Sequence, residues 1–290
     1  MSTFVPLELV SRVAPVGVRF WDDLTRSFIT GDLDVSAQPV DVALPPTVLV
    51  PNRSGVYYAT SLPFFPAGGF GGGDDAYWAS ITARPFVIRV DDPAGRFMPF
   101  SFTASLPARG LVGWACAGGP SPLPGNAPAS SVPLFSSPSR VLGGAFAVIR
   151  ASLWDANANA PAAFAALRVT VDPALPPVWG IADAGGRIAM VFAYPELPAP
   201  PVDGTGLLPL SRQTWTLPIQ VAYVPGAAAS TYPDLCAIFE QAAATLWADQ
   251  ARATPLTAVT FTYGVEVVLR TAATAVGASP LSVLYVTAGA

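Results

Sequence analysis

The hydrophobic positions along the chain fall in short runs that prolines and glycines interrupt. Among 290 residues there are 32 prolines and 25 glycines, and a proline inside a helix costs about 3 kcal/mol. The runs between them are rich in valine, threonine, phenylalanine and tyrosine, which is typical of β-strands. We therefore predict an all-β protein. The expected strands lie near residues 16–21, 32–37, 48–50, 55–60, 86–90, 97–104, 146–154, 164–171, 187–194, 213–223, 258–270 and 281–287.

One segment departs from this pattern. Residues 232–247 are rich in alanine, Pro233 suits the first turn of a helix, and Asp234 complements the helix dipole there. Hydrophobic residues from Leu235 to Leu246 recur at helical spacing. The pattern predicts one helix of about four turns over residues 233–248.

Three blocks of the first half recur in the second half at a nearly constant spacing. The blocks are 18–22 with 151–155, 33–37 with 167–171, and 54–58 with 185–190, at offsets of 133, 134 and about 131 residues. Unrelated strands in a biased composition would also produce some of this similarity. We favour two copies of one β-sandwich module, at residues 1–110 and 144–290. Residues 111–143, rich in proline and glycine, form a linker or a packed loop between them.

The composition excludes several functional classes. All 15 basic residues are arginine, and there is no histidine, so histidine-dependent triads and metal sites are impossible, as is a catalytic lysine. A net charge of −4 argues against nucleic-acid binding, which needs a basic surface. No apolar run approaches the roughly 20 residues of a membrane-spanning helix, and no signal peptide is visible at the N-terminus. We expect synthesis in the cytoplasm, no membrane insertion and no cofactor or metal.

The two cysteines, Cys116 and Cys236, are separated by 120 residues. Nothing in the sequence brings them together, so they would pair only through the tertiary fold. Buried free thiols are the favoured interpretation, because free cysteine is among the most buried residue types, and disulfides are rare in the cytoplasm.

Polar side chains offer little local chemistry. Adjacent aspartates at 22–23, 74–75 and 91–92 point to opposite faces of a strand, and turn formation explains Asp22 and Asp92 better than catalysis does. The few glutamates have no local spacing that would make a glycosidase pair, although pairing across the fold stays open. Arginines in or beside strands are expected to form forked pairs with aspartates rather than bind phosphate. They are Arg19, Arg89, Arg150, Arg168 and Arg270.

A glycine-rich stretch at residues 68–73 is flanked by aromatic side chains. No lysine follows the glycines and no helix is expected after them, which excludes a phosphate-binding loop. The aromatic residues either fold back onto their own module or contact a partner protein or a sugar. They form the candidate interaction loop: Phe64, Phe65, Phe70, Tyr77 and Trp78.

Two resemblances extend this interpretation. Residues 154–192, with Trp154-Asp155 and the run Asp183-Ala184-Gly185-Gly186-Arg187, resemble carboxypeptidase-regulatory-like domains. The resemblance implies a small Ig-like or transthyretin-like sandwich used for structure or binding, and residues 16–58 match it more loosely.

The order of four further segments along the chain is more specific. They are 18–22, 51–57, 92–100 and 133–138, and together they resemble accessory proteins encoded with the sheath, tube and baseplate of contractile injection systems, which are phage-tail-like particles. The resemblance implies a non-catalytic structural subunit at the cap, terminator or baseplate end, oligomeric in the assembly. Its partners would be the other particle proteins, and the assembled particle would be released from the cell.

Two other functions remain open at this point. One is a surface-binding or carbohydrate-binding module that uses the candidate interaction loop as its platform. The other is a glycoside-active enzyme, which would need two carboxylates converging in one cleft.

Overall fold

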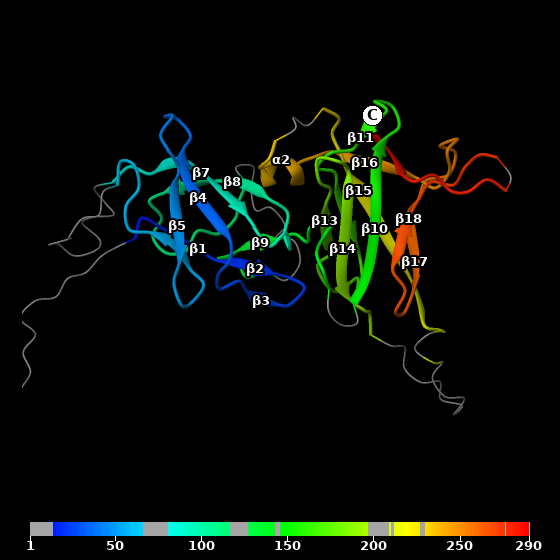
Figure 1. Cartoon of the computed structure of the whole chain (residues 1–290), viewed down its shortest axis with the longest axis horizontal. Helices are drawn as coiled ribbons and strands as arrows, with labels where there is room; N and C mark the ends of the chain where they lie inside the picture. The colour runs from blue at the N-terminus through cyan, green and yellow to red at the C-terminus, as the bar shows by residue number, and fades with distance from the viewer. Residues whose placement is uncertain are drawn as a thin grey trace, which may run out of the picture.

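The structure is a computed structural model that describes residues 14–65, 81–116, 127–142, 146–196, 209, 212–226, 230–275 and 277–289. Within these residues the fold is all-β with a single short helix, α2 (Leu235–Phe239). The described residues up to 142 and those from 146 onward form two bodies of strands, called the first and second halves, with α2 between them (Figure 1). Within the segment predicted as a linker or packed loop, Val132–Leu134 form a strand that pairs with Phe20–Asp22 and so belongs to the first half. In the described part of the chain, no helix combines the length and the hydropathy needed to cross a membrane.

The first half contains a large antiparallel sheet and a small mixed one. The six-stranded sheet has the order β1-β6-β5-β4-β7-β8, and the three-stranded sheet has the order β3-β2-β9, in which β2 and β9 are parallel. Strands β1 and β2 are one extended stretch that changes sheets at Arg19. The strands are β1 (Val16–Val18), β2 (Phe20–Asp22), β3 (Ser27–Phe28), β4 (Asp34–Pro39), β5 (Thr47–Pro51), β6 (Tyr57–Ala59), β7 (Arg84–Asp91), β8 (Phe100–Leu106) and β9 (Val132–Leu134).

The second half forms one ten-stranded curled sheet. Its long strand β10 pairs with β18 through residues 149–151 and with β19 through residues 153–155. Strand β15 changes partners in the same way, from β17 to β12 and β16. The strands are β10 (Phe146–Asp155), β11 (Ala160–Pro161), β12 (Ala166–Val169), β13 (Val178–Ile181), β14 (Arg187–Ala193), β15 (Thr214–Ala222), β16 (Ala243–Trp247), β17 (Ala258–Thr262), β18 (Val267–Leu269) and β19 (Leu284–Ala288).

The repeat seen in the sequence is also present in the pairing of the strands. Val16 pairs with Ala59 in the first half, and Ile149 pairs with Met190 in the second, which are the same positions at offsets of 133 and 131. The parallel pairs agree at one partner only, because Phe20 and Leu153 are 133 residues apart, whereas their partners Val132 and Leu284 are 152 residues apart. Since a slip of one residue would turn every side chain to the other face, the antiparallel agreement shows that these two strand pairs have the same register. The sheets as a whole differ, with six and three strands in the first half and ten strands in the second.

The turns repeat as well. Asn52 Oδ1 accepts hydrogen bonds from the backbone N–H groups of Ser54 and Val56, and Asp183 Oδ1 accepts from Gly185 and Arg187. Each turn ends in a glycine with positive φ, Gly55 at 73° and Gly186 at 76°. A short polar side chain that bonds to its own turn, followed by glycine, explains why these positions match in sequence.

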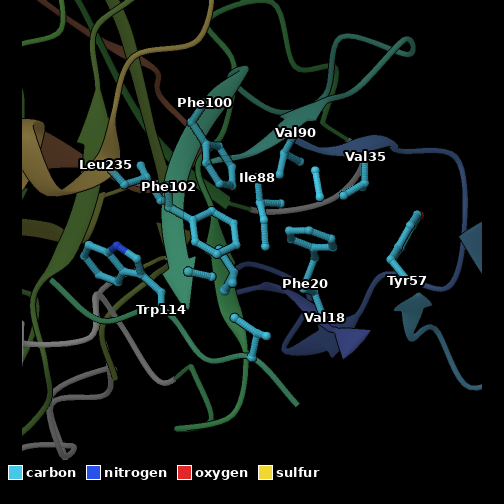
Figure 2. Packing of buried hydrophobic residues seen from close by; sticks show 14 of the residues in the cluster. Val18, Phe20, Val35, Tyr57, Ile88, Val90, Phe100, Phe102, Trp114 and Leu235 are labelled. Atoms are coloured by element: carbon cyan, nitrogen blue, oxygen red, sulfur yellow. The ribbon is translucent and has the colours of Figure 1, made fainter. Parts of the chain in front are cut away.

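The buried side chains form two clusters that do not follow the division of the chain. One fills the second half. The other fills the first half but also contains Phe164, Ala166 and Ile181 from the second half and Leu235 and Ile238 from α2. Figure 2 shows Leu235 near Phe102 and Trp114 in this first cluster. The hydrophobic core therefore continues across the junction between the two halves.

The predicted four-turn helix is wrong in its extent. α2 covers only Leu235–Phe239, and residues 243–247 form strand β16, which pairs with β19 and β15. Helical spacing within residues 235–239 is real, but the alanines after Glu240 occupy a sheet position because their backbone groups are bonded to neighbouring strands. Alanine favours helices and is depleted in strands, so the pairing with β15 and β19 overrode the local preference of these residues.

Candidate functional site at the junction of the two halves

Helix α2 belongs to the second half by sequence but is bonded to the first. It lies in the connection between β15 and β16. Asp234 caps its N-terminus by accepting a hydrogen bond from the backbone N–H of Ala237 at 2.9 Å. Just before it, the carbonyl of Pro233 accepts from the N–H of Ser101 on β8 at 2.9 Å. The segment thus extends the edge of the first sheet while Leu235 enters the first core, where it is fully buried.

Aromatic rings from both halves meet at the C-terminal end of α2. The ring centroid of Phe239 lies 5.2 Å from Trp114, 5.4 Å from Phe135 and 5.0 Å from Trp179. Trp114 and Phe135 come from the first half and Trp179 from β13 of the second. Each such pair contributes about 0.5–1.5 kcal/mol beyond the area it buries, so Phe239 joins the halves through side-chain packing.

Cys116 and Cys236 form a disulfide bond, with their Cα atoms 5.4 Å apart. The prediction of two buried free thiols is therefore wrong. Cys116 follows the last strand of the main first sheet, and Cys236 lies within α2, so the fold of the α2 segment brings the two sulfurs together. No local sequence pattern marks this pairing, since it depends on a contact between residues 120 positions apart.

A groove with a volume of about 550 Å³ lies beside α2, on the outer face of β12, β15 and β16. Its polar lining includes Arg168, Gln220 and Gln241, its aromatic lining is Trp179 and Phe239, and small alanines form much of the remainder. Volumes of about 300–1,000 Å³ are usual for ligand pockets. The groove is thus large enough for a small ligand or a few residues of a peptide.

A second cleft, of about 610 Å³, lies between the halves and is lined by residues 137–139 of the first and by Arg150, Asp183 and Arg187 of the second, among others. Arg150 donates to the carbonyl of Pro138 and pairs with Glu266 at 3.0 Å, while Arg187 pairs with Asp183 at 2.7 Å. Both guanidinium groups are therefore neutralised within the chain.

The expected aspartate partners are not found for the five strand arginines within the described residues. Arg150 pairs with a glutamate, and three others lie over aromatic rings instead. The guanidinium carbons of Arg19, Arg89 and Arg168 lie 5.0 Å from Phe28, 6.0 Å from Tyr232 and 5.7 Å from Trp179, measured to ring centroids. Cation–π contact replaces the predicted ion pairs at these positions.

The predicted turn roles of Asp22 and Asp92 are confirmed. Asp22 accepts from the N–H of Leu24 and the hydroxyl of Thr25. Asp92 accepts from the backbone and side chain of Arg96. Burial alone would raise the pKa of the Asp92 carboxyl, but the hydrogen bonds from Arg96 outweigh it and hold that pKa below its usual value. These carboxylates are engaged in structure and are not free for acid–base chemistry.

Of the candidate interaction loop, the structure describes Phe64 and Phe65. Phe65 is buried, with its ring 6.1 Å from that of Phe86, so it folds back onto its own module. Phe64 is 47% exposed and lies 4.3 Å from the guanidinium carbon of Arg84. Phe70, Tyr77 and Trp78 lie outside the described residues.

Two carboxylates border one small pocket, of about 370 Å³. They belong to Asp234 and Glu240, at the two ends of α2. Asp234 is occupied as the helix cap, and Glu240 is exposed. Among the described residues, no group of three histidine, cysteine, aspartate or glutamate side chains could hold a metal ion.

No protein-family model and no curated protein matches the chain. Among solved structures, the shaft pilin SpaA from Lactobacillus rhamnosus GG aligns at 11% identity over 76% of this chain and 95% of its own, with a TM-score of 0.18. A tetra-tandem repeat from the extending region of a large adhesion protein aligns at 9% identity over 88% of this chain and 66% of its own, with a TM-score of 0.14. Likenesses at this level carry no functional information.

Proposed function

We propose that this chain is a non-catalytic structural subunit of a contractile injection, phage-tail-like particle, at its cap, terminator or baseplate end. The observation that supports the proposal best is the junction, where α2 and the disulfide between Cys116 and Cys236 hold two repeated modules together. A subunit that transmits or resists force benefits from modules that cannot separate. The kind of particle comes from the resemblance in sequence, and sheath, tube or baseplate proteins are its expected partners.

The chemistry of the described residues fits a structural role. The buried aspartates Asp22, Asp92 and Asp155 each accept hydrogen bonds from their own turns. Both arginines of the inter-module cleft pair with carboxylates of the chain, Arg150 with Glu266 and Arg187 with Asp183. The disulfide fits a subunit that leaves the cytoplasm with a released particle, because disulfides persist in oxidising surroundings.

Co-assembly tests the proposal. The chain is expressed together with the sheath and tube proteins of a contractile injection particle, and particles are separated from free protein by sedimentation. We expect the chain to sediment with the particles, and Cys236→Ser to lower the retained fraction. Ser54→Ala, in an exposed turn far along the chain from the junction, serves as the control and should be retained like the wild type. A chain that stays monomeric and never sediments with sheath or tube contradicts the proposal.

A carbohydrate-binding module is the second candidate, and an aromatic cluster at the start of β15 favours it. Tyr194 lies 4.5 Å from Tyr263 and 5.7 Å from Trp215, measured between ring centroids, and all three side chains are partly exposed. Exposed aromatic rings of this kind are common in binding surfaces. Binding of the purified chain to a glycan array, lost in Trp215→Ala and kept in Phe64→Ala, would support this candidate over the first.

An enzymatic role has its own test. If the purified chain hydrolysed a glycoside and Glu240→Gln removed that activity, the carboxylates beside α2 would be catalytic and the structural proposal would be wrong.

A further inference from the structure

The groove beside α2 contains a buried acceptor without a donor. Gln241 Nε2 donates to the carbonyl of Phe164 at 3.0 Å, which fixes the orientation of the side-chain amide because a carbonyl cannot donate. Gln241 Oε1 is therefore the free atom. It is buried and finds no hydrogen-bond donor among the described residues. Since buried polar atoms are nearly always bonded, this oxygen is suited to accept an N–H or O–H from a ligand.

The same groove holds a guanidinium group in a restrained position. Arg168 Nε donates to Gln220 Oε1, and its guanidinium carbon lies 5.7 Å from the ring centroid of Trp179. No ion pair to Arg168 occurs in the part of the chain that the structure describes. Its two terminal nitrogens remain for a ligand, and this planar fork matches a carboxylate in a bidentate pair.

The floor of the groove is made of small side chains on three neighbouring strands. Ala166 of β12 pairs with Ala222 of β15, which pairs with Ala243 of β16, and all three line the groove. No lining residue carries a carboxylate, so Arg168 is the one charged group among them. The positive charge of Arg168 therefore gives the groove a local preference for an anion.

We propose that this groove binds the free C-terminal carboxylate of an extended peptide segment from another particle protein. The terminal carboxylate pairs with Arg168, a backbone N–H of the peptide donates to Gln241 Oε1, and a small apolar side chain covers the alanines. An extended peptide supplies these groups together, and capture of a chain terminus is a known mode of peptide recognition. The inference rests on the proposed function, of which it specifies one contact.

An acidic saccharide is the competing ligand, and the rings of the groove argue against it. A sugar binds by stacking on a free aromatic face, but Trp179 is already covered by Arg168 and approached by Phe239. Phe239 in turn contacts Trp114 and Phe135. The aromatic side chains here serve to hold the guanidinium and to join the two halves.

Binding of a peptide pool to the full-length protein tests the proposal. The probe is a set of biotinylated heptapeptides with the last four positions randomised, prepared once as free acids and once as C-terminal amides. We expect the free-acid pool to bind and the amide pool to bind about tenfold more weakly, as loss of one charged hydrogen-bonded pair implies. Oligogalacturonate is measured in parallel as the acidic saccharide.

Three variants place the binding in the groove. Arg168→Gln should weaken binding of the free-acid pool about tenfold, and Arg168→Lys should restore part of it, because the charge returns without the fork. Gln241→Leu should weaken both pools equally, since it removes the acceptor for a backbone N–H. Arg252→Gln is the matched control. Arg252 is exposed and bonded to Asn157 elsewhere, so this variant should bind like the wild type.

Three results would overturn the proposal: absence of binding by the free-acid pool, equal binding of free acid and amide, or binding that Arg168→Gln leaves intact. Oligogalacturonate binding lost in Arg168→Gln, without peptide binding, would assign the groove to a saccharide instead. The proposed function is judged separately by sedimentation. If the chain still sediments with particles while no peptide binds, the proposal that the groove binds a peptide C-terminus is wrong and the proposed function stands.

Discussion

The two halves of the molecule bury an aspartate at the same place in the repeat but neutralise it differently. Asp22 and Asp155 each follow a tryptophan at the end of a strand and accept backbone N–H groups from the next turn. In the first half, Arg140 donates to both carboxylate oxygens of Asp22, at 3.2 and 2.6 Å. In the second half, the hydroxyl of Tyr223 donates to Asp155 Oδ2 at 3.0 Å.

The comparison shows that the bonds from each aspartate to its own turn are the same in both halves, whereas the second partner of the aspartate differs. Bonds from the carboxylate to its own turn are local, so they persist wherever the tryptophan–aspartate pair recurs. Arg140 comes from the segment after β9, and Tyr223 from the segment after β15. The second partner of each aspartate therefore comes from a segment that is not equivalent in the two halves. A full ion pair and a neutral hydroxyl therefore perform the same task at equivalent positions.

The disulfide that joins the halves should have the largest effect on stability. It closes a loop of 120 residues, and the chain-entropy relation gives a contribution of about 5 kcal/mol for that length. Cys236→Ser should lower the free energy of unfolding by about 5 kcal/mol, and urea denaturation measures this loss. The reduced wild type should match the variant. A loss below about 1 kcal/mol would mean that α2 holds the halves together without the bond.

Removing Arg140 should cause the next largest loss of stability. In Arg140→Met the carboxylate of Asp22, only 3% exposed, loses both donors from the guanidinium. Breaking a buried ion pair on one side costs about 3–5 kcal/mol, and urea denaturation measures it. The double variant Arg140→Met/Asp22→Asn should recover part of the loss, because no buried charge is left. If the single variant were as stable as wild type, Asp22 would not depend on Arg140.

The repeated turn glycines give a matched pair of substitutions. Both have positive φ, which costs an L-residue about 1–2 kcal/mol. A Cβ on Gly55 would lie 2.8 Å from the carbonyl oxygen of Ile29, whereas one on Gly186 would lie 2.3 Å from that of Leu153.

We expect Gly186→Ala to cost about 3 kcal/mol, the sum of strained backbone and overpacking, and Gly55→Ala to cost less. Thermal unfolding followed by circular dichroism ranks the two. The reverse order would show that the second-half turn has room to move.

Tyr223 should give the smallest effect, and that effect should depend on pH. Tyr223→Phe leaves one oxygen of Asp155 without its side-chain donor, which costs about 1–3 kcal/mol at neutral pH. Burial of the side chain, together with its hydrogen bond to Asp155, raises the pKa of Tyr223 to about 12.

Because the folded pKa of Tyr223 is above the unfolded value of about 10, its stabilisation is complete below pH 10 and is lost as pH rises through 12. The difference in unfolding free energy between wild type and Tyr223→Phe should therefore shrink between pH 10 and pH 12 by about 2 kcal/mol. A constant difference across that range would contradict the assignment of the shift to this pair.

The sequence was most informative where structure is local. The tryptophan–aspartate pairs, the Asn52 and Asp183 turns and the glycines after them could be recognised because a side chain bonds to backbone two to four residues away. These bonds require particular residue types at fixed spacing, so they leave a pattern. The all-β class could be predicted because prolines and glycines interrupt the hydrophobic runs and leave segments too short for long helices.

The junction left no such pattern. The groove combines Arg168 of β12, Trp179 of β13 and Gln241 after α2, which are scattered along the chain and ordinary in their local context. The residues of the candidate interaction loop are close in sequence and so form a visible pattern, yet Phe65 is a core side chain. A possible signal was the alanine content of residues 242–244, which marks a floor of small side chains as well as it marks a helix.

The sequence by itself determined the strand class, the repeat and the turns, because proline, glycine and short polar side chains act on the backbone within a few residues. The tertiary structure alone decided that β16 is a strand and that α2 has about one and a half turns. It also decided that Cys116 forms a disulfide with Cys236, and that Asp22 and Asp155 have different partners. Those outcomes depend on which distant segments lie side by side, since contacts between residues far apart in the chain are set by the packing of whole sheets.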